Sequence, residues 1–384
     1  MTARLSLVLA LVAAAVATVS TRPACAQQAR STRMDPSARS AGMGGASTAV
    51  LWSDDVNGWS NPALLGYSRG LRYGWANTVL ISYASDVTFQ TDRFSYAWGG
   101  IGLAVESHTL NYGRIELTDP LGTPIGSYEP TERVRPLSGG ISVSGILETL
   151  ASLRGASPPA LTRYGDVAVG FARKAVRIRL APAPYQAEAR TTASDFGLLL
   201  RAKPIPWTDA GRPFCELTYG FAALNHNDAP VAFIDEDRVD YVLRQYRHGI
   251  GARFGVRLSQ GASARLEHRF GHWVANGMDP LLSVAVAADF SRYQRGPEVR
   301  YGTGIDQVGG ELVVANTLAV RFGHVGDEFR GIDGYSLGLG LGFSLADLAG
   351  ARYDYARDPQ GTGLSSLNRH AVAAWVDPVA FVRR

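Results

Sequence analysis

Apolar and polar residues alternate with a period of two along most of the chain after residue 66. Between residues 335 and 343, for example, Leu337, Leu339 and Leu341 are separated by single glycines. Because successive side chains of a β-strand point to opposite faces, this pattern predicts strands with one apolar face and one charged or small-residue face. The segments that fit are 72–81, 93–98, 100–109, 135–146, 165–174, 190–202, 216–224, 249–258, 263–271, 282–290, 307–314, 317–324, 335–343, 351–356 and 369–375.

Alternation alone leaves two all-β architectures open. In a soluble sandwich the apolar faces pack on a second sheet, whereas in a membrane barrel they face lipid. The length of 384 residues and the absence of domain linkers favour one large sheet. Since single-chain bacterial barrels have an even number of strands, we predict an antiparallel transmembrane β-barrel of about 14 strands. The longer connections are expected at 118–134, 151–163, 181–189, 225–241 and 357–368.

The first 26 residues are typical of a secretory signal peptide. A short basic start with Arg4 precedes an apolar run at 5–19, and Ala24-Cys25-Ala26 offers small residues at a cleavage site. The run is too short for a membrane span of about 20 residues. A lipoprotein signal with Cys25 as the lipidated residue is the weaker alternative, because Arg22-Pro23-Ala24 precedes it. We expect cleavage after Ala26 and export to the outer membrane.

Charge and cysteine content exclude several classes of function. The formal charge of +4 falls to +2 once Arg4 and Arg22 leave with the signal, which is too little for a nucleic-acid partner. Cys215 is then the only cysteine, so the mature chain has no intrachain disulfide and no CxxC zinc motif. We therefore expect no metal and no cofactor.

No catalytic arrangement stands out either. His268 and His272 are the only close histidines, and on one strand face they would lie about 13 Å apart, too far for one metal ion. The sequence has no GxSxG motif. The pair Asp54-Asp55 could act as an acid and base, but turn capping or ion pairing is the more ordinary role of such residues. We predict a protein that is not an enzyme.

The segment at 38–66 differs from the rest because it is rich in small residues and does not alternate. We expect three parts: the signal peptide at 1–26, a plug at 27–70 and the barrel at 71–384. Charged residues dominate the inward positions of the barrel, and we expect Asp54 and Asp55 of the plug to neutralise them. The candidates for the lumen are Arg253, Arg257, Arg265, Glu267, Arg269, Arg321, Arg352 and Asp354.

The same N-terminal segment resembles the start of the PorV/PorQ family, within the wider group of FadL-like outer-membrane barrels. The family's R-x-x-G-M-G-G-A-x-x-A block, acidic pair and N-P-A motif are matched in order. The matching residues are Arg39, Gly42, Met43, Gly44, Gly45, Ala46, Ala49, Asp54, Asp55, Asn61, Pro62 and Ala63. Weaker similarity continues at 195–199 and in the last strands. The end departs from many such barrels, because Val382-Arg383-Arg384 follows Phe381.

The resemblance implies outer-membrane lipid as the surroundings and two alternative roles. PorV-like members serve protein secretion and bind machinery subunits or exported cargo proteins, and we take this scaffold role as the first interpretation. FadL-like members carry hydrophobic small molecules through a lumen that the N-terminal segment blocks, and this is the alternative.

Overall fold

The computed structural model describes residues 29–52, 56, 58–181, 187–206, 211–233, 239–295, 299–328, 330–346, 348–361 and 364–379. Fourteen antiparallel strands form a closed barrel in which each strand pairs with its neighbours along the chain, and β1 pairs with β18 to close the wall. They are β1 Gly70–Ile81, β2 Ala84–Trp98, β3 Ile101–Tyr112, β6 Thr131–Ser142, β7 Gly165–Arg179, β8 Glu188–Ile205, β9 Pro213–Leu224, β12 Arg244–Val256, β13 Leu282–Arg295, β14 Val299–Val314, β15 Leu318–Asp327, β16 Ile332–Leu345, β17 Ala349–Asp358 and β18 Leu367–Val376.

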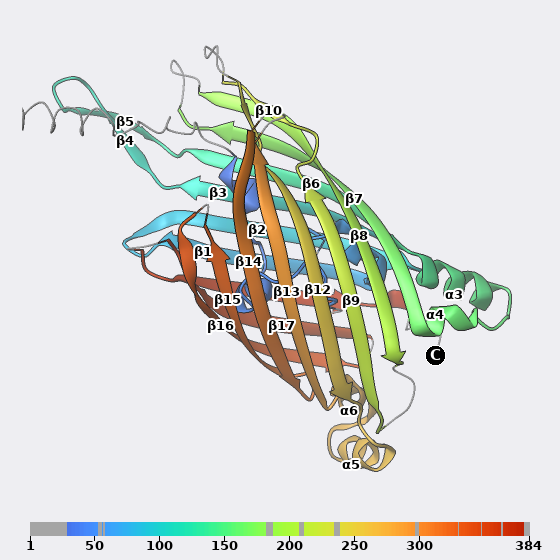
Figure 1. Cartoon of the computed structure of the whole chain (residues 1–384). Coiled ribbons are helices and arrows are strands. Elements are labelled where there is room, and N and C mark those ends of the chain that lie inside the picture. Colours follow the sequence, from blue (N-terminus) through green and yellow to red (C-terminus); the bar gives the residue numbers. More distant parts are fainter. Residues whose placement is uncertain are drawn as a thin grey trace, which may run out of the picture.

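The two ends of the barrel carry different connections (Figure 1). One end, here the hairpin end, carries β4 Ile115–Thr118 with β5 Pro124–Tyr128, and β10 Pro230–Val231 with β11 Asp240–Tyr241. The other, the helical end, carries α3 Val143–Leu153, α4 Ala160–Tyr164, α5 Gln260–Phe270 and α6 His272–Gly277. None of the described helices combines the length and the apolar composition that a membrane-crossing helix needs.

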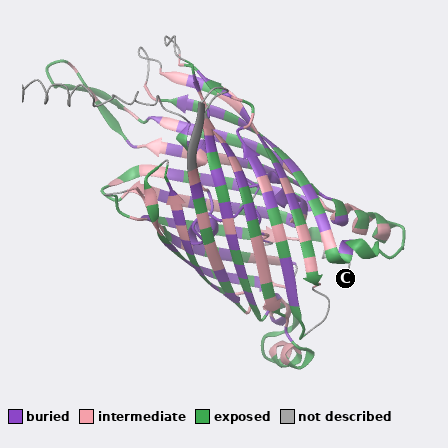
Figure 2. Cartoon of the chain, viewed as in Figure 1, coloured by how far each residue is buried: buried purple, intermediate pink, exposed green. Residues whose placement is uncertain are grey.

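Burial alternates along most of the length of the barrel strands, as the banding in Figure 2 shows. A belt of exposed apolar side chains runs round the outer wall: Leu103, Val105, Phe322 and Leu339 are each more than half exposed. A continuous apolar outer surface of this extent is typical of a barrel that faces lipid. The predicted class, a transmembrane antiparallel barrel of 14 strands, is confirmed, and the sandwich alternative is wrong.

One of the fifteen expected strands is wrong. Residues 263–270 lie in α5 at the helical end and Gly271 ends the helix, while Ser259 caps its start by accepting a hydrogen bond from the Ala262 amide. The stretch is rich in helix-forming Ala, Leu, Glu and Arg, and its apparent alternation of apolar and charged residues arises by chance. Arg265, Glu267 and Arg269 therefore lie on a helix outside the barrel and not in its lumen, which corrects their expected position.

The lumen is filled by the residues that precede β1. This N-terminal segment, 29–68, contains the short helices η1 Arg30–Arg33, α2 Ala38–Gly42 and η2 Pro62–Tyr67. It begins near the hairpin end, where Ala29 packs among inward residues of β6, β7 and β8. It then crosses the barrel, contacting β15 to β18 through α2 and β3, β6, β7 and β8 through η2. In Figure 1 it appears in blue inside the wall.

Candidate functional site

The wall of the barrel fits the N-terminal segment through inward-facing glycines. At Gly170 an added Cβ atom would lie 2.3 Å from the Ala63 amide nitrogen, and at Gly323 it would lie 2.1 Å from that of Gly44. Backbone atoms cannot yield to such contacts, so only glycine allows the segment to approach this closely. Six of the fourteen strands contribute a glycine at which an added Cβ atom would lie within 2.5 Å of the backbone of the segment: Gly102, Gly140, Gly170, Gly220, Gly309 and Gly323.

The Asn-Pro-Ala motif of the segment sits against this glycine surface. Asn61 caps η2 by accepting from the Ala63 amide through its side-chain oxygen. Its side-chain nitrogen donates to the carbonyls of Thr48 and Leu198, at 3.0 and 3.1 Å. One asparagine thus joins two parts of the segment to strand β8. The proline that follows occupies the first turn, where its missing N–H has no cost.

A row of buried charged side chains links α2 to strands β14, β15 and β17 of the wall. Arg39 donates two hydrogen bonds to Glu311 of β14, at 2.6 and 2.8 Å, and its guanidinium lies 5.0 Å from the Trp52 ring centre. Glu311 also accepts from Arg321 at 2.6 Å. Arg321 in turn contacts Asp354 at 2.8 Å, and Arg352 contacts the same aspartate at 3.0 Å. All five side chains are at most 7% exposed.

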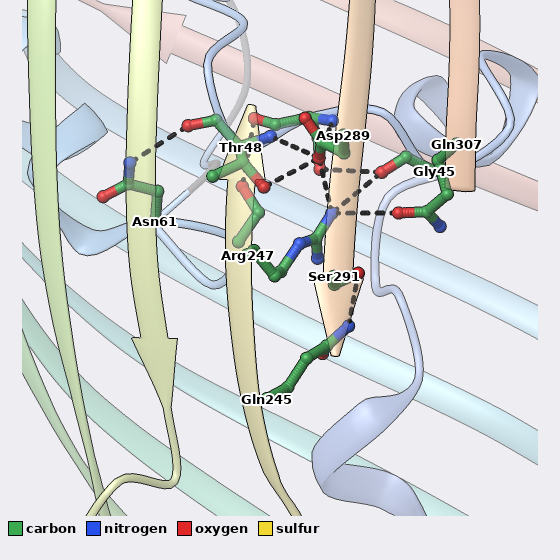
Figure 3. A network of polar contacts seen from close by, with 10 residues as sticks. Gly45, Thr48, Asn61, Gln245, Arg247, Asp289, Ser291 and Gln307 are labelled. Atoms are coloured by element: carbon green, nitrogen blue, oxygen red, sulfur yellow. Dashed lines mark hydrogen bonds and ion pairs between the residues drawn. The ribbon is translucent and has the colours of Figure 1, made fainter. Parts of the chain in front are cut away.

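A second buried network holds the loop between α2 and η2 (Figure 3). Asp289 of β13 accepts from the amides of Ser47 and Thr48, both at 2.9 Å, and from the Thr48 hydroxyl at 2.7 Å. Arg247 of β12 pairs with the same carboxylate at 2.8 Å and donates to the Gly45 carbonyl at 3.0 Å. The wall therefore binds the backbone of the segment through a charged pair.

A cavity of about 850 Å³ lies at the hairpin end, between the N-terminal segment and the connections β1–β2 and β17–β18. Its apolar lining includes Met34, Leu110, Ile305 and Val325, and Tyr112 and Tyr293 add aromatic surface. Its charged lining has five arginines against two aspartates: Arg30, Arg33, Arg247, Arg330, Arg369, Asp35 and Asp358. The size is that of a small-molecule site.

Three of the five cavity arginines pair with aspartates of the wall or its connections: Arg247 with Asp289, Arg330 with Asp327 and Arg369 with Asp358. Arg369 pairs with Asp358 at 2.8 Å and donates to the Asp35 carbonyl at 2.7 Å. Burial raises the pKa of the Asp35 carboxyl above its ordinary value, although Arg369 opposes this shift. Burial also lowers the pKa of the Arg33 guanidinium, which lies 5.8 Å from the Tyr293 ring centre. An apolar chamber lined by several guanidinium groups suits a ligand with an apolar body and an anionic group.

The structure brings together only some of the residues singled out in the sequence. Arg321, Arg352 and Asp354 lie in the buried row of charges. Arg253 faces inward near the helical end of β12, with its guanidinium 5.7 Å from the Phe214 ring centre. Arg257 follows the end of β12 and pairs with Asp279 at 2.6 Å, outside the lumen row. Asp54 and Asp55 lie outside the described residues.

Glu311, Asp289 and Arg247 are functional candidates that the sequence analysis missed. Among the described residues, the carboxylates that balance the buried arginines of the row come from the barrel wall, at Glu311 and Asp354. The signal was present, because the alternation in the expected strands 282–290 and 307–314 places Asp289 and Glu311 inward.

Comparison with known proteins adds a likeness in shape. The solved structure of a Pseudomonas aeruginosa FadL homologue is 11% identical, with a TM-score of 0.42 over 88% of this chain and 98% of that one. The P. putida toluene transporter TodX is 10% identical, with a TM-score of 0.43 over 88% and 97%. No protein-family model and no curated protein matches the sequence. These identities and scores carry no inference about function, and the resemblance to PorV/PorQ stays a prediction.

Within the described residues no three His, Cys, Asp or Glu side chains are grouped in a way that could hold a metal ion.

Proposed function

We propose that this protein is an outer-membrane channel that admits small molecules with an apolar body and an anionic group, and that its N-terminal segment closes the lumen. The observation that carries the proposal is the cavity at the hairpin end, whose floor is the N-terminal segment. A ligand entering from this end meets a chamber of suitable size before it meets the closure.

The chemistry of the lining supports the ligand class. Arg247, Arg330 and Arg369 have aspartate partners in the wall or its connections. Arg30 and Arg33 come from the N-terminal segment and add positive charge beside Met34. A carboxylate or phosphate can bind a guanidinium through two parallel hydrogen bonds, while the apolar wall desolvates the rest of the ligand.

The second role implied by the resemblance, a secretion scaffold, gains no support from these features. A scaffold acts through an outer docking surface, whereas the cavity lies inside the barrel wall and has the protein's own segment as its floor. Of the two roles, carriage of small molecules is the better match.

Binding of decanoate and of 1-decanol to the purified protein in non-ionic detergent tests the ligand class. The two probes share an alkyl chain and differ in charge. Native mass spectrometry should show decanoate retained at concentrations where decanol is not. A charge-assisted hydrogen bond contributes about 1.5–3 kcal/mol, so Arg30→Gln with Arg33→Gln should weaken decanoate binding by about tenfold or more.

The matched control is Arg154→Gln with Arg163→Gln, which removes two exposed arginines at the helical end. These substitutions should leave binding unchanged. Equal retention of decanoate and decanol by the native protein, or full retention of decanoate after loss of Arg30 and Arg33, would contradict the proposed ligand class.

A further inference from the structure

The outer wall of β6, β7 and β8 changes character abruptly toward the hairpin end. Near the helical end its outward side chains are apolar and include Leu137, Val169 and Phe171. Toward the hairpin end the outward positions carry six arginines, all exposed. This basic patch consists of Arg133, Arg135, Arg173, Arg177, Arg179 and Arg190.

The strand register places three of these arginines in one line across three strands. Arg133 lies directly opposite Arg177, and Arg177 lies directly opposite Arg190. Side chains in such positions have Cβ atoms about 4.5–5.5 Å apart, and like charges there destabilise a sheet. The wall therefore concentrates positive charges whose mutual repulsion lowers the stability of the protein when no ligand is bound.

Little negative charge within the described chain offsets this concentration. Glu188 pairs with Arg177 at 2.9 Å, with Arg190 at 2.7 Å and with Arg179 at 3.7 Å. That single carboxylate serves three arginines, and no ion pair is formed between Arg133, Arg135 or Arg173 and another described residue. Six guanidinium groups thus face one carboxylate.

The patch begins where the apolar belt ends. Arg173 lies directly opposite Leu137, which is 60% exposed, and Phe171 is the preceding outward residue on the same strand. Two residues along a strand span about 6.6 Å, so the arginines lie one short step above side chains that face acyl chains. That depth corresponds to the headgroup layer, where long basic side chains reach the lipid phosphates.

We infer that this basic patch is a binding site for a lipid whose headgroup carries more than one phosphate, with its acyl chains on the adjoining Leu137 and Phe171 surface. Guanidinium groups bind phosphate oxygens in pairs. The six arginines with the one carboxylate of Glu188 leave a formal charge of +5 (six minus one), which is more than a single phosphate of about −2 balances. The inference rests on the lipid-facing belt and is independent of the proposed channel function.

Thermal unfolding of the detergent-solubilised protein, with native mass spectrometry of retained lipid, tests this site. The probes are bisphosphorylated lipid A, its monophosphorylated form, phosphatidylglycerol and inorganic pyrophosphate. We expect bisphosphorylated lipid A to be retained and to raise the unfolding temperature most, because a ligand that binds only the folded state stabilises it. Pyrophosphate, which lacks acyl chains, should have little effect.

The diagnostic variant combines Arg133→Gln, Arg135→Gln and Arg173→Gln, which spares the three arginines paired with Glu188. It should bind bisphosphorylated lipid A at least tenfold more weakly. Without lipid it should be at least as stable as the native protein, because it loses repulsion. The control variant combines Arg154→Gln, Arg163→Gln and Arg265→Gln, the same loss of charge at the helical end, and should bind normally.

Several results would overturn the inference. Unchanged lipid binding by the diagnostic variant would show that the patch is not the site. A lower stability of that variant without lipid would assign the arginines a structural role. Equal binding of phosphatidylglycerol would remove the requirement for several phosphates, and equal binding of pyrophosphate would identify free phosphate as the ligand.

Discussion

Replacing Glu311 by Gln should release the N-terminal segment from the wall. The substitution keeps the shape of the side chain but removes the charge that Arg39 and Arg321 share. In the native row, three guanidinium groups face two carboxylates. After Glu311→Gln, only Asp354 remains to balance Arg39, Arg321 and Arg352.

The expected magnitude follows from burial. An exposed ion pair contributes about 0–1 kcal/mol, but breaking a buried one costs about 3–5 kcal/mol because a desolvated charge is left behind. Arg39 and Glu311 are 7% and 4% exposed, so the higher range applies. At about 1.4 kcal/mol for each factor of ten, the population with α2 undocked should rise about 100-fold or more.

Planar-bilayer conductance is the appropriate assay, with heat-modifiable gel migration as the check that the barrel has folded. Glu311→Gln should give frequent openings where the native protein is closed. Arg39→Gln should also open the lumen while leaving the Arg321–Glu311 pair in the wall. The double variant should be less than additive, since both changes break one interaction.

A folded Glu311→Gln barrel that stays as closed as the native one would refute this reasoning. So would strictly additive effects of the two substitutions. In either case the row of charges would stabilise the wall without holding the segment.

Three further predictions concern the closure and the membrane face. Gly323→Ala should destabilise the docked segment by about 1–3 kcal/mol, because its Cβ atom would overlap the Gly44 amide. The control is Gly326→Ala on the same strand, where the nearest atom to the added Cβ would be 3.9 Å away. Gly326→Ala should leave both the conductance and the thermal unfolding unchanged. Leu339→Arg should cost about 2–4 kcal/mol of stability in bilayers, measured by denaturant unfolding, and a harmless substitution would mean that this face does not meet lipid. Burial raises the pKa of the Asp35 carboxyl above its unfolded value of 3.8, so the docked segment binds the proton more tightly than the released segment. Docking should therefore strengthen as the pH falls through the raised pKa toward 3.8. Conductance should decrease on acidification in the native protein but not in Asp35→Asn.

The strand plan could be predicted from the sequence because each lipid-facing position demands an apolar side chain. Leu337, Leu339 and Leu341 indicate their face without any tertiary information. The helix α5 could not be separated from a strand in this way, because Leu266 and Phe270 happen to alternate with charged neighbours. The local signs of a helix were a capping serine at position 259 and the helix-forming composition of the residues that follow it.

The site was less predictable because it depends on pairing across strands. The alternation shows that Arg321 points inward, but not that Glu311 lies opposite it, since that depends on the register of β14 with β15. The cavity is harder still, because residues as distant as Arg33 and Tyr293 line it together. Glycines were visible in the sequence, yet only the path of the N-terminal segment explains their positions.

The fit between the N-terminal segment and the glycine-lined wall also constrains the order of assembly. The closing seam joins β1 to β18, the first and last strands of the wall. Once that seam has formed, the lumen can be entered only from an end of the barrel. The segment, with its three short helices, would then have to thread into the lumen before it could bond to opposite sides of the wall. We therefore expect the segment to dock while the sheet is still open, so that the strands close around it. In that order of assembly the segment would serve as a template for the wall before it closes the lumen.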